Sequence, residues 1–202
     1  MRNFALLVLL AFGAIFHTHA LAADTQTVDV DYGIRLQLPN WMSVMDSKTT
    51  AALERIAQDS AASRSMATPP GRRSLLSASG RDINVRLIAT SPTPTSQSEI
   101  DDMGSADVQQ VARQLESQIR KTGTTLIGGV TAYTSNRVAN RRSFIYEYQR
   151  STLLGTPSIP KHVVVYQLVS GNILLEMTVS FPAGDQSALA VLGNIQKTLQ
   201  LP

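Results

Sequence analysis

The 202-residue chain contains no cysteine, so no disulfide can stabilise it. The same absence excludes the cysteine-linked lipid anchor of exported bacterial lipoproteins. Charged residues are sparse at 16%, and 18 Lys and Arg against 15 Asp and Glu leave a net charge of +3. So small a net positive charge gives no reason to expect nucleic acid as a partner.

Histidine is nearly as scarce, with three residues, of which only His162 lies beyond position 19. Metal sites need clustered Cys, His or spaced carboxylates, and one histidine without cysteine supplies no such set. Asp29 and Asp31 share one face of a predicted strand and could hold calcium, but the chain has no loop of the calcium-binding kind. Two solvated carboxylates are the simpler interpretation. We therefore expect no bound metal and no cofactor.

One long apolar run is present, and it lies at the N-terminus. Residues 4–16 carry no charge, follow Arg2, and precede the small-residue pattern Ala20-Leu21-Ala22. A run of this length is shorter than the ~20 residues that a membrane helix needs, and the pattern is typical of a secretory signal peptide. We expect cleavage after residue 22, a periplasmic or secreted protein, and no transmembrane segment in the mature chain.

The remaining residues 23–202 suit a single domain, which at this length buries roughly 70% of its unfolded surface. Hydrophobic alternation indicates its first strand at 27–38, either as one strand or as two short strands that pivot at Gly33. Pro39 ends it, and Trp41 is expected to pack back onto the sheet edge. Further strands are predicted at 75–78, 83–89, 124–133, 143–150, 162–169 and 173–181.

Helices are predicted between these strands. One begins at Asp46 or Ser47 and ends near 62, and one covers 106–121 after a Ser105 cap. A last helix follows Asp185, with its apolar face at Leu189, Leu192, Ile195 and Leu199. Residues 91–104, which are rich in proline and threonine, are expected to form a long loop. The order predicts an α+β fold, a twisted antiparallel sheet of about six to seven strands covered by helices.

Four features in this order resemble the PsbP-like superfamily. They are the segment ending in Leu38-Pro39-Asn40-Trp41, a strand with central glycines at 126–133, the hairpin 163–181, and the terminal helix. The superfamily includes the extrinsic photosystem II protein PsbP, DcrB-like bacterial envelope proteins and a nuclear import factor that binds the GTPase Ran. The resemblance implies helices on both sides of the sheet and a role in binding other proteins. The metal-binding histidines of some relatives have no matching set here.

A cluster of cationic residues offers the best candidate binding site. Arg137, Arg141 and Arg142 lie in the turn between two predicted strands, and Lys161 is a candidate fourth member. Arginine forks bind carboxylate or phosphate through two hydrogen bonds. The cluster could therefore contact an acidic partner, a lipid headgroup or an anionic cell-wall polymer. A solvated hairpin end is the alternative interpretation.

Catalysis has little support in the sequence. A hydrolase using His162 with a serine and a carboxylate is possible in principle, but the chain has no Gly-x-Ser-x-Gly elbow. The leading hypothesis is therefore a non-enzymatic accessory or binding protein of the cell envelope, with an envelope protein as partner. A periplasmic or secreted hydrolase using His162 is the alternative.

Overall fold

The computed structural model describes residues 24–45, 49, 50, 52, 55, 71–151 and 159–202. The predicted signal peptide lies outside these residues. So does most of the helix predicted to end near 62, although positions 49, 50, 52 and 55 are helical. None of the helices in the described part of the chain has the length and apolar content that crossing a membrane requires.

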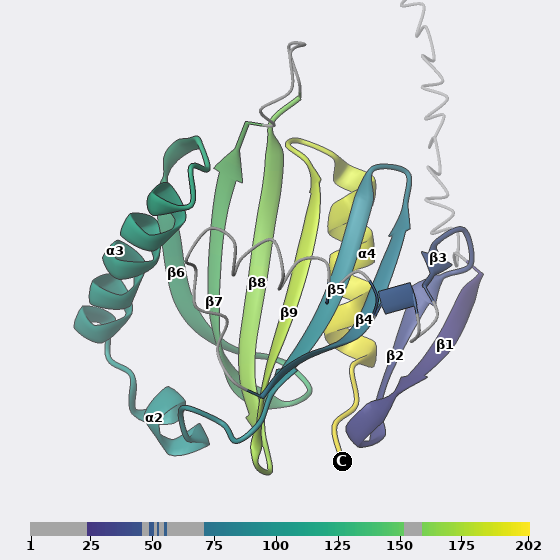
Figure 1. Cartoon of the computed structure of the whole chain (residues 1–202), viewed down its shortest axis with the longest axis horizontal. Coiled ribbons are helices and arrows are strands. Elements are labelled where there is room, and N and C mark those ends of the chain that lie inside the picture. Colours follow the sequence, from purple (N-terminus) through teal and green to yellow (C-terminus); the bar gives the residue numbers. More distant parts are fainter. Residues whose placement is uncertain (1–23, 46–48, 51, 53–54, 56–70, 152–158) are drawn as a thin grey trace, which may run out of the picture.

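The main sheet has seven strands, and all of its pairings are antiparallel (Figure 1). In spatial order the strands are β3 (Ser43–Val44), β4 (Arg72–Gly80), β5 (Ile83–Thr90), β9 (Ile173–Pro182), β8 (Lys161–Ser170), β7 (Arg141–Arg150) and β6 (Leu126–Val138). Strands that follow one another in the sequence mostly pair, as short turns require. The predicted α+β fold with an antiparallel sheet is confirmed.

A separate hairpin precedes this sheet, so the second of the two interpretations of residues 27–38 is correct. Its strands are β1 (Thr25–Val30) and β2 (Ile34–Pro39), and a short turn over Asp31–Gly33 joins them. Tyr32 has a φ of 63° in this turn and is 44% exposed, because the turn takes it off the buried face. Trp41 packs at the end of β4, where a Cβ on Gly80 would lie 2.9 Å from its ring.

Helix α4 (Gln186–Thr198) covers one face of the sheet, on the far side in Figure 1. The Asp185 carboxylate caps it by accepting hydrogen bonds from the amides of Ser187 (2.8 Å) and Ala188 (3.3 Å), as predicted. Its buried residues are Ala188, Val191, Leu192 and Ile195. Leu189, predicted on this apolar face, is instead 45% exposed, because the buried stripe is centred about one position away.

Helix α3 (Ser105–Lys121) packs on the opposite face beside β6. Its N-cap is Gly104, whose amide donates to the Asp107 carboxylate (3.0 Å), so the predicted Ser105 cap is wrong by one residue. The predicted loop over 91–104 is also wrong in part. It contains helix α2 (Gln97–Asp102), which Ser96 and Glu99 begin with a reciprocal capping box.

Both faces of the sheet are buried at its centre, in two separate apolar clusters. Alternate residues of β9 face α4 and belong to the larger cluster: Ile173, Leu175, Met177, Val179 and Phe181. Phe144, Tyr146, Val163 and Val165 form the smaller cluster under α3. Glu176 alternates with the β9 residues of the larger cluster and so faces the other side of the sheet, where it is half-buried and forms an ion pair with Arg72 (3.0 Å).

Candidate functional site

The β6–β7 turn carries the arginines that the sequence singles out. Its central residues, Ala139 and Asn140, have φ values of 50° and 53°, as in a two-residue hairpin turn whose twist matches the strands. Arg137 precedes the turn, and Arg141 and Arg142 follow it. Neighbouring strand residues point to opposite faces, so Arg141 and Arg142 lie on different sides of the sheet.

Arg142 faces α3, where it holds the α2–α3 connection against the sheet. One of its nitrogens, Nη2, donates to the Met103 carbonyl (3.0 Å) and to the Thr134 hydroxyl (3.0 Å). These partners use one edge of its guanidinium, and the side chain is half-buried. Arg142 therefore serves the packing of the helices and does not join the other two arginines in one site.

Lys161 lies at the far end of the sheet from the arginine turn. In the strand register it pairs with Arg150 and Pro182, whereas the arginine turn adjoins the other ends of β7 and β8. Its Nζ donates to the Asp82 carbonyl (3.2 Å) and lies 3.7 Å from an oxygen of the Asp82 carboxylate. The suggested nearness of Lys161 to the three arginines is therefore wrong.

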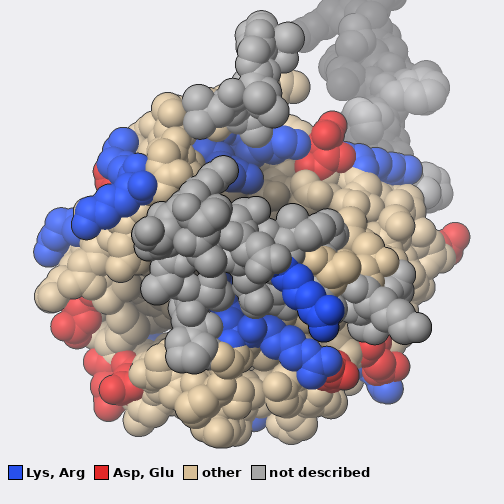
Figure 2. Space-filling view, in the orientation of Figure 1, with Lys and Arg blue, Asp and Glu red and all other residues tan. Residues whose placement is uncertain are grey.

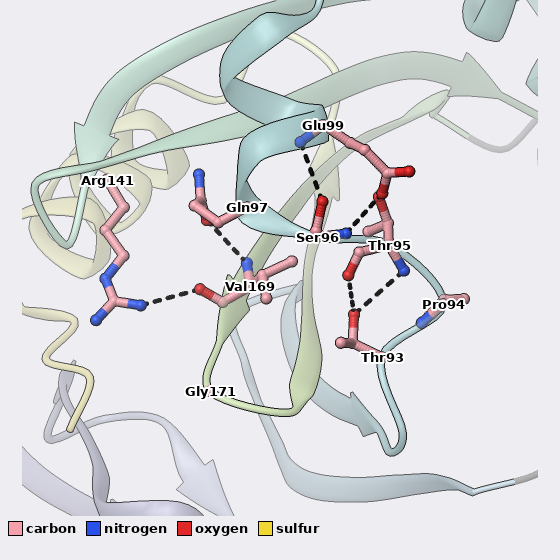
Figure 3. A pocket seen from close by; sticks show the side chains of 9 residues that line it. All are labelled: Thr93, Pro94, Thr95, Ser96, Gln97, Glu99, Arg141, Val169 and Gly171. Carbon is pink, nitrogen blue, oxygen red and sulfur yellow. Dashed lines mark hydrogen bonds between the residues drawn. The ribbon is translucent and has the colours of Figure 1, made fainter.

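Arg141 borders a first pocket, of about 450 Å³, between the segment before α2 and the β8–β9 turn (Figure 3). Its guanidinium donates to the Val169 carbonyl (3.0 Å). The other polar groups satisfy one another, since the Glu99 carboxylate accepts from the Thr95 hydroxyl and the Ser96 amide, both at 2.7 Å. The hydrogen bond from Thr95 lowers the pKa of Glu99, which keeps it charged. This pocket has little left to offer an anion.

On its other side, Arg141 lines a second pocket of about 510 Å³ beside the end of α4. We call it the cationic pocket. Its lining includes Arg137, Arg141 and Lys197, together with the polar side chains of Asn140, Gln196 and Gln200, and no Asp or Glu. Among the described residues, no ion pair joins any of the three cations to an Asp or Glu side chain. Arg141 also donates to the backbone oxygen of Pro202, the last residue of the sequence (3.5 Å).

The cationic pocket lies on the α4 side of the sheet and differs in charge from the opposite face. Figure 2 shows Lys and Arg interspersed with Asp and Glu over the face that carries α3, as expected for a mixed-charge protein. Three cations in one hollow that no Asp or Glu side chain lines are a local excess of positive charge. Sequence reasoning missed Lys197, because only the tertiary fold brings the last turn of α4 beside the β6–β7 turn.

A third pocket, of about 420 Å³, shares Arg137 and Gln196 with the cationic pocket. Tyr133, Thr134, Ser135 and Ile145 complete its lining. Gln196 is fixed by its hydrogen bond to the Tyr166 hydroxyl (2.6 Å). Burial, and then the charge of Glu147, raise the pKa of Tyr133, while the Arg137 cation opposes them. The Tyr133 phenol and the Arg137 guanidinium are therefore electrostatic neighbours.

The alternative site, around His162, has one of the contacts that a hydrolase needs. His162 Nε2 lies 2.9 Å from a carboxylate oxygen of Glu147, and its ring packs on Phe181 with the ring centroids 5.1 Å apart. None of the hydrogen bonds found among the described residues links His162 to a serine hydroxyl. The three pockets above do not include it. A hydrolytic triad needs a nucleophile as well as a base and its carboxylate.

Within the described ranges, no three His, Cys, Asp or Glu side chains lie close enough to hold a metal ion. Asp29 and Asp31, the calcium candidates, have separate cationic partners: Asp29 pairs with Arg35 (2.5 Å) and Asp31 with Arg73 (2.7 Å). These pairs are exposed, and they account for both carboxylates.

No family model matches the chain. No curated protein sequence matches it either. Among solved structures, cyanobacterial PsbP (CyanoP) from Synechocystis sp. PCC 6803 shares 14% identity and a TM-score of 0.49, over 89% of this chain and 94% of that one. The Ran-binding protein Mog1p of Saccharomyces cerevisiae shares 10% identity and a TM-score of 0.42, over 90% of this chain and 86% of that one.

A structure from Bacteroides thetaiotaomicron shares 10% identity and a TM-score of 0.39, over 84% of this chain and 45% of that one. The TM-scores are all below 0.5, so these structures add no argument to the PsbP-like resemblance that the sequence suggested. Similarity at these identities concerns the fold alone. The resemblance to DcrB-like envelope proteins stays a prediction.

Proposed function

We propose that this protein is an exported, non-enzymatic binding protein of the cell envelope. In this proposal, its cationic pocket receives a carboxylate or phosphate group of a partner. The observation that carries the proposal is the set of Arg137, Arg141 and Lys197 around one pocket that no Asp or Glu side chain lines. Export is supported by the signal-peptide pattern of residues 1–22, and residues 23–202 form the single domain of the mature protein.

The helix end in the pocket cannot account for all three cations. The C-terminus of a helix carries roughly half a negative charge, and Lys197 in the last turn of α4 complements it. Arg141 is partly engaged by the oxygens of Val169 and of Pro202, the last residue, whereas Arg137 remains as surplus positive charge. An anion bound between guanidinium groups would gain charge-assisted hydrogen bonds, which are about twice as strong as neutral ones.

Inorganic pyrophosphate is a suitable probe, because it offers phosphate oxygens without any further recognition element. In a ¹⁵N-labelled titration, we expect its largest shift changes at the β6–β7 turn and the last turn of α4. The Arg113→Gln variant, which removes an exposed cation from α3, should give the same changes as the wild type. The absence of saturable changes at both segments would contradict the proposal.

The alternative function, a hydrolase using His162, has the hydrogen bond to Glu147 in its favour. That contact also has a structural explanation, since the two residues face one side of neighbouring strands β7 and β8 and can simply satisfy each other. We therefore keep the binding function as the proposal.

A further inference from the structure

The cationic pocket and the third pocket are neighbours with two residues in common, Arg137 and Gln196. A ligand bound to one is therefore within reach of the other. Their chemistry differs. The cationic pocket holds charge, whereas the third pocket offers the Tyr133 ring, and Tyr133 is 40% exposed. Together they suit a ligand with an anionic group close to an apolar one.

The wall that joins the pockets is a strand at the edge of the sheet. Strand β6 comes last in the strand order, so it pairs with β7 on one side only. Tyr133, Ser135 and Arg137 are alternate positions of this strand and all three line the third pocket, and the pairing with β7 shifts register between Ser135 and Val138. Alternate strand residues repeat every ~7 Å, and an extended peptide presents its own alternate side chains at the same spacing.

We infer that the two pockets form one groove, which binds an extended acidic segment of a partner protein. A carboxylate of the segment lies at Arg137 and the other cations, and an apolar side chain four residues earlier lies against Tyr133. This inference rests on the proposed function and adds the class of ligand to it. A peptide fits better than a lipid headgroup, because edge strands commonly bind partner segments in an extended conformation.

The groove predicts a spacing that peptides can test. Tyr133 and Arg137 are four residues apart, at most about 13 Å along a strand, because the register shift after Ser135 can only shorten this distance. We would therefore use the capped peptide acetyl-Phe-Thr-Asp-Ser-Asp-amide, in which phenylalanine and the last aspartate have the same separation. Two matched peptides replace either the phenylalanine by alanine or both aspartates by asparagine.

The wild-type protein should bind the phenylalanine peptide at least about five-fold more tightly than the alanine peptide. It should bind the asparagine peptide at least about ten-fold more weakly than the phenylalanine peptide. In Tyr133→Ala, the preference for phenylalanine should fall below about two-fold. The matched control is Ile127→Ala on the same strand, where Ile127 is 43% exposed and lines neither pocket. The Ile127→Ala protein should keep the full preference for the phenylalanine peptide over the alanine peptide.

Shift mapping on the wild type keeps the inference testable if Tyr133→Ala does not fold. The phenylalanine peptide should shift the amides of Tyr133 and Ser135, and the alanine peptide should shift them much less. Equal affinity of both peptides for the wild type would overturn the inference. So would binding to phosphatidylglycerol vesicles that outcompetes the peptides and does not change in Tyr133→Ala.

The pyrophosphate titration distinguishes failure of the groove inference from failure of the proposed function. If pyrophosphate binds at the cationic pocket while the phenylalanine and alanine peptides bind alike, the groove inference fails and the proposed function stands. If pyrophosphate and all of the peptides leave the pocket residues unshifted, both fail.

Discussion

Replacing Leu175 with alanine tests the burial of strand β9 directly. Leu175 is 0% exposed and lies between Leu168 of β8 and Ala89 of β5, in the cluster under α4. Truncating a leucine in such a position removes its transfer free energy and leaves a cavity, which together cost about 2–5 kcal/mol of unfolding free energy. The rigid centre of a seven-stranded sheet cannot collapse around the gap, so we expect a value in the upper half of this range.

The neighbouring residue provides the comparison. Sequence alternation alone predicts that Glu176→Ala stays within about 0.5 kcal/mol, as at an exposed site. In the structure, Glu176 accepts from Arg72 (3.0 Å) and from Gln167 (3.2 Å), and its side chain is only 22% exposed. Removing it leaves both donors without this partner. We expect a loss of about 1 kcal/mol, since Arg72 is exposed enough to regain water.

Urea unfolding followed by circular dichroism measures both changes, with the slope of each transition as a check for two-state behaviour. The expected ranking is a large loss for Leu175→Ala, a small one for Glu176→Ala, and a clear gap between them. A loss below about 1 kcal/mol for Leu175→Ala, or a larger loss for Glu176→Ala, would refute the register of the last hairpin.

Three further predictions follow from individual contacts. Arg142→Ala should lower the unfolding free energy by about 1–2 kcal/mol, because Arg142 anchors the α2–α3 connection. It should not weaken pyrophosphate binding. Urea unfolding and the pyrophosphate titration check the two outcomes. The hydrogen bond from Ser187 lowers the pKa of Asp185, so the stability it gives is complete above its ordinary value near 4 and is lost as the pH falls through the lower folded value. Melting temperatures at pH 3 and pH 5 should therefore differ less in Asp185→Asn than in the wild type, and equal differences would contradict the cap. His162→Ala should leave any hydrolysis of an ester and peptidase substrate panel unchanged, whereas an activity lost with His162 would favour the hydrolase.

Much of the fold could be predicted from local patterns. Short stretches of sequence predict the alternation in β9 and the Asp185 cap of α4, and the structure has both. Helix α2 is missing from the prediction although Ser96 and Glu99 have the spacing of a capping box, because the prolines before it favoured a loop. Tyr32 fits the alternation of its neighbours, but its place in a turn depends on how β1 and β2 pair.

The candidate site was predictable only in part. Arg137 and Arg141 are adjacent to one turn, so local sequence identifies them, and strand alternation already separates Arg141 from Arg142. Lys197 and Gln196 join them only through the packing of α4 on the sheet, which no local pattern encodes. The distance from Lys161 to the turn is likewise set by the length of β8.

The central claim is that surplus positive charge in the cationic pocket binds an anion. Its most direct test compares the pyrophosphate affinity of the Arg137→Gln/Lys197→Gln protein with that of Arg113→Gln/Lys121→Gln, which loses the same charge from α3. The account predicts a loss of at least about ten-fold for the first variant and less than about two-fold for the second. Equal losses in the two variants would show that net charge alone governs binding, and would contradict the account.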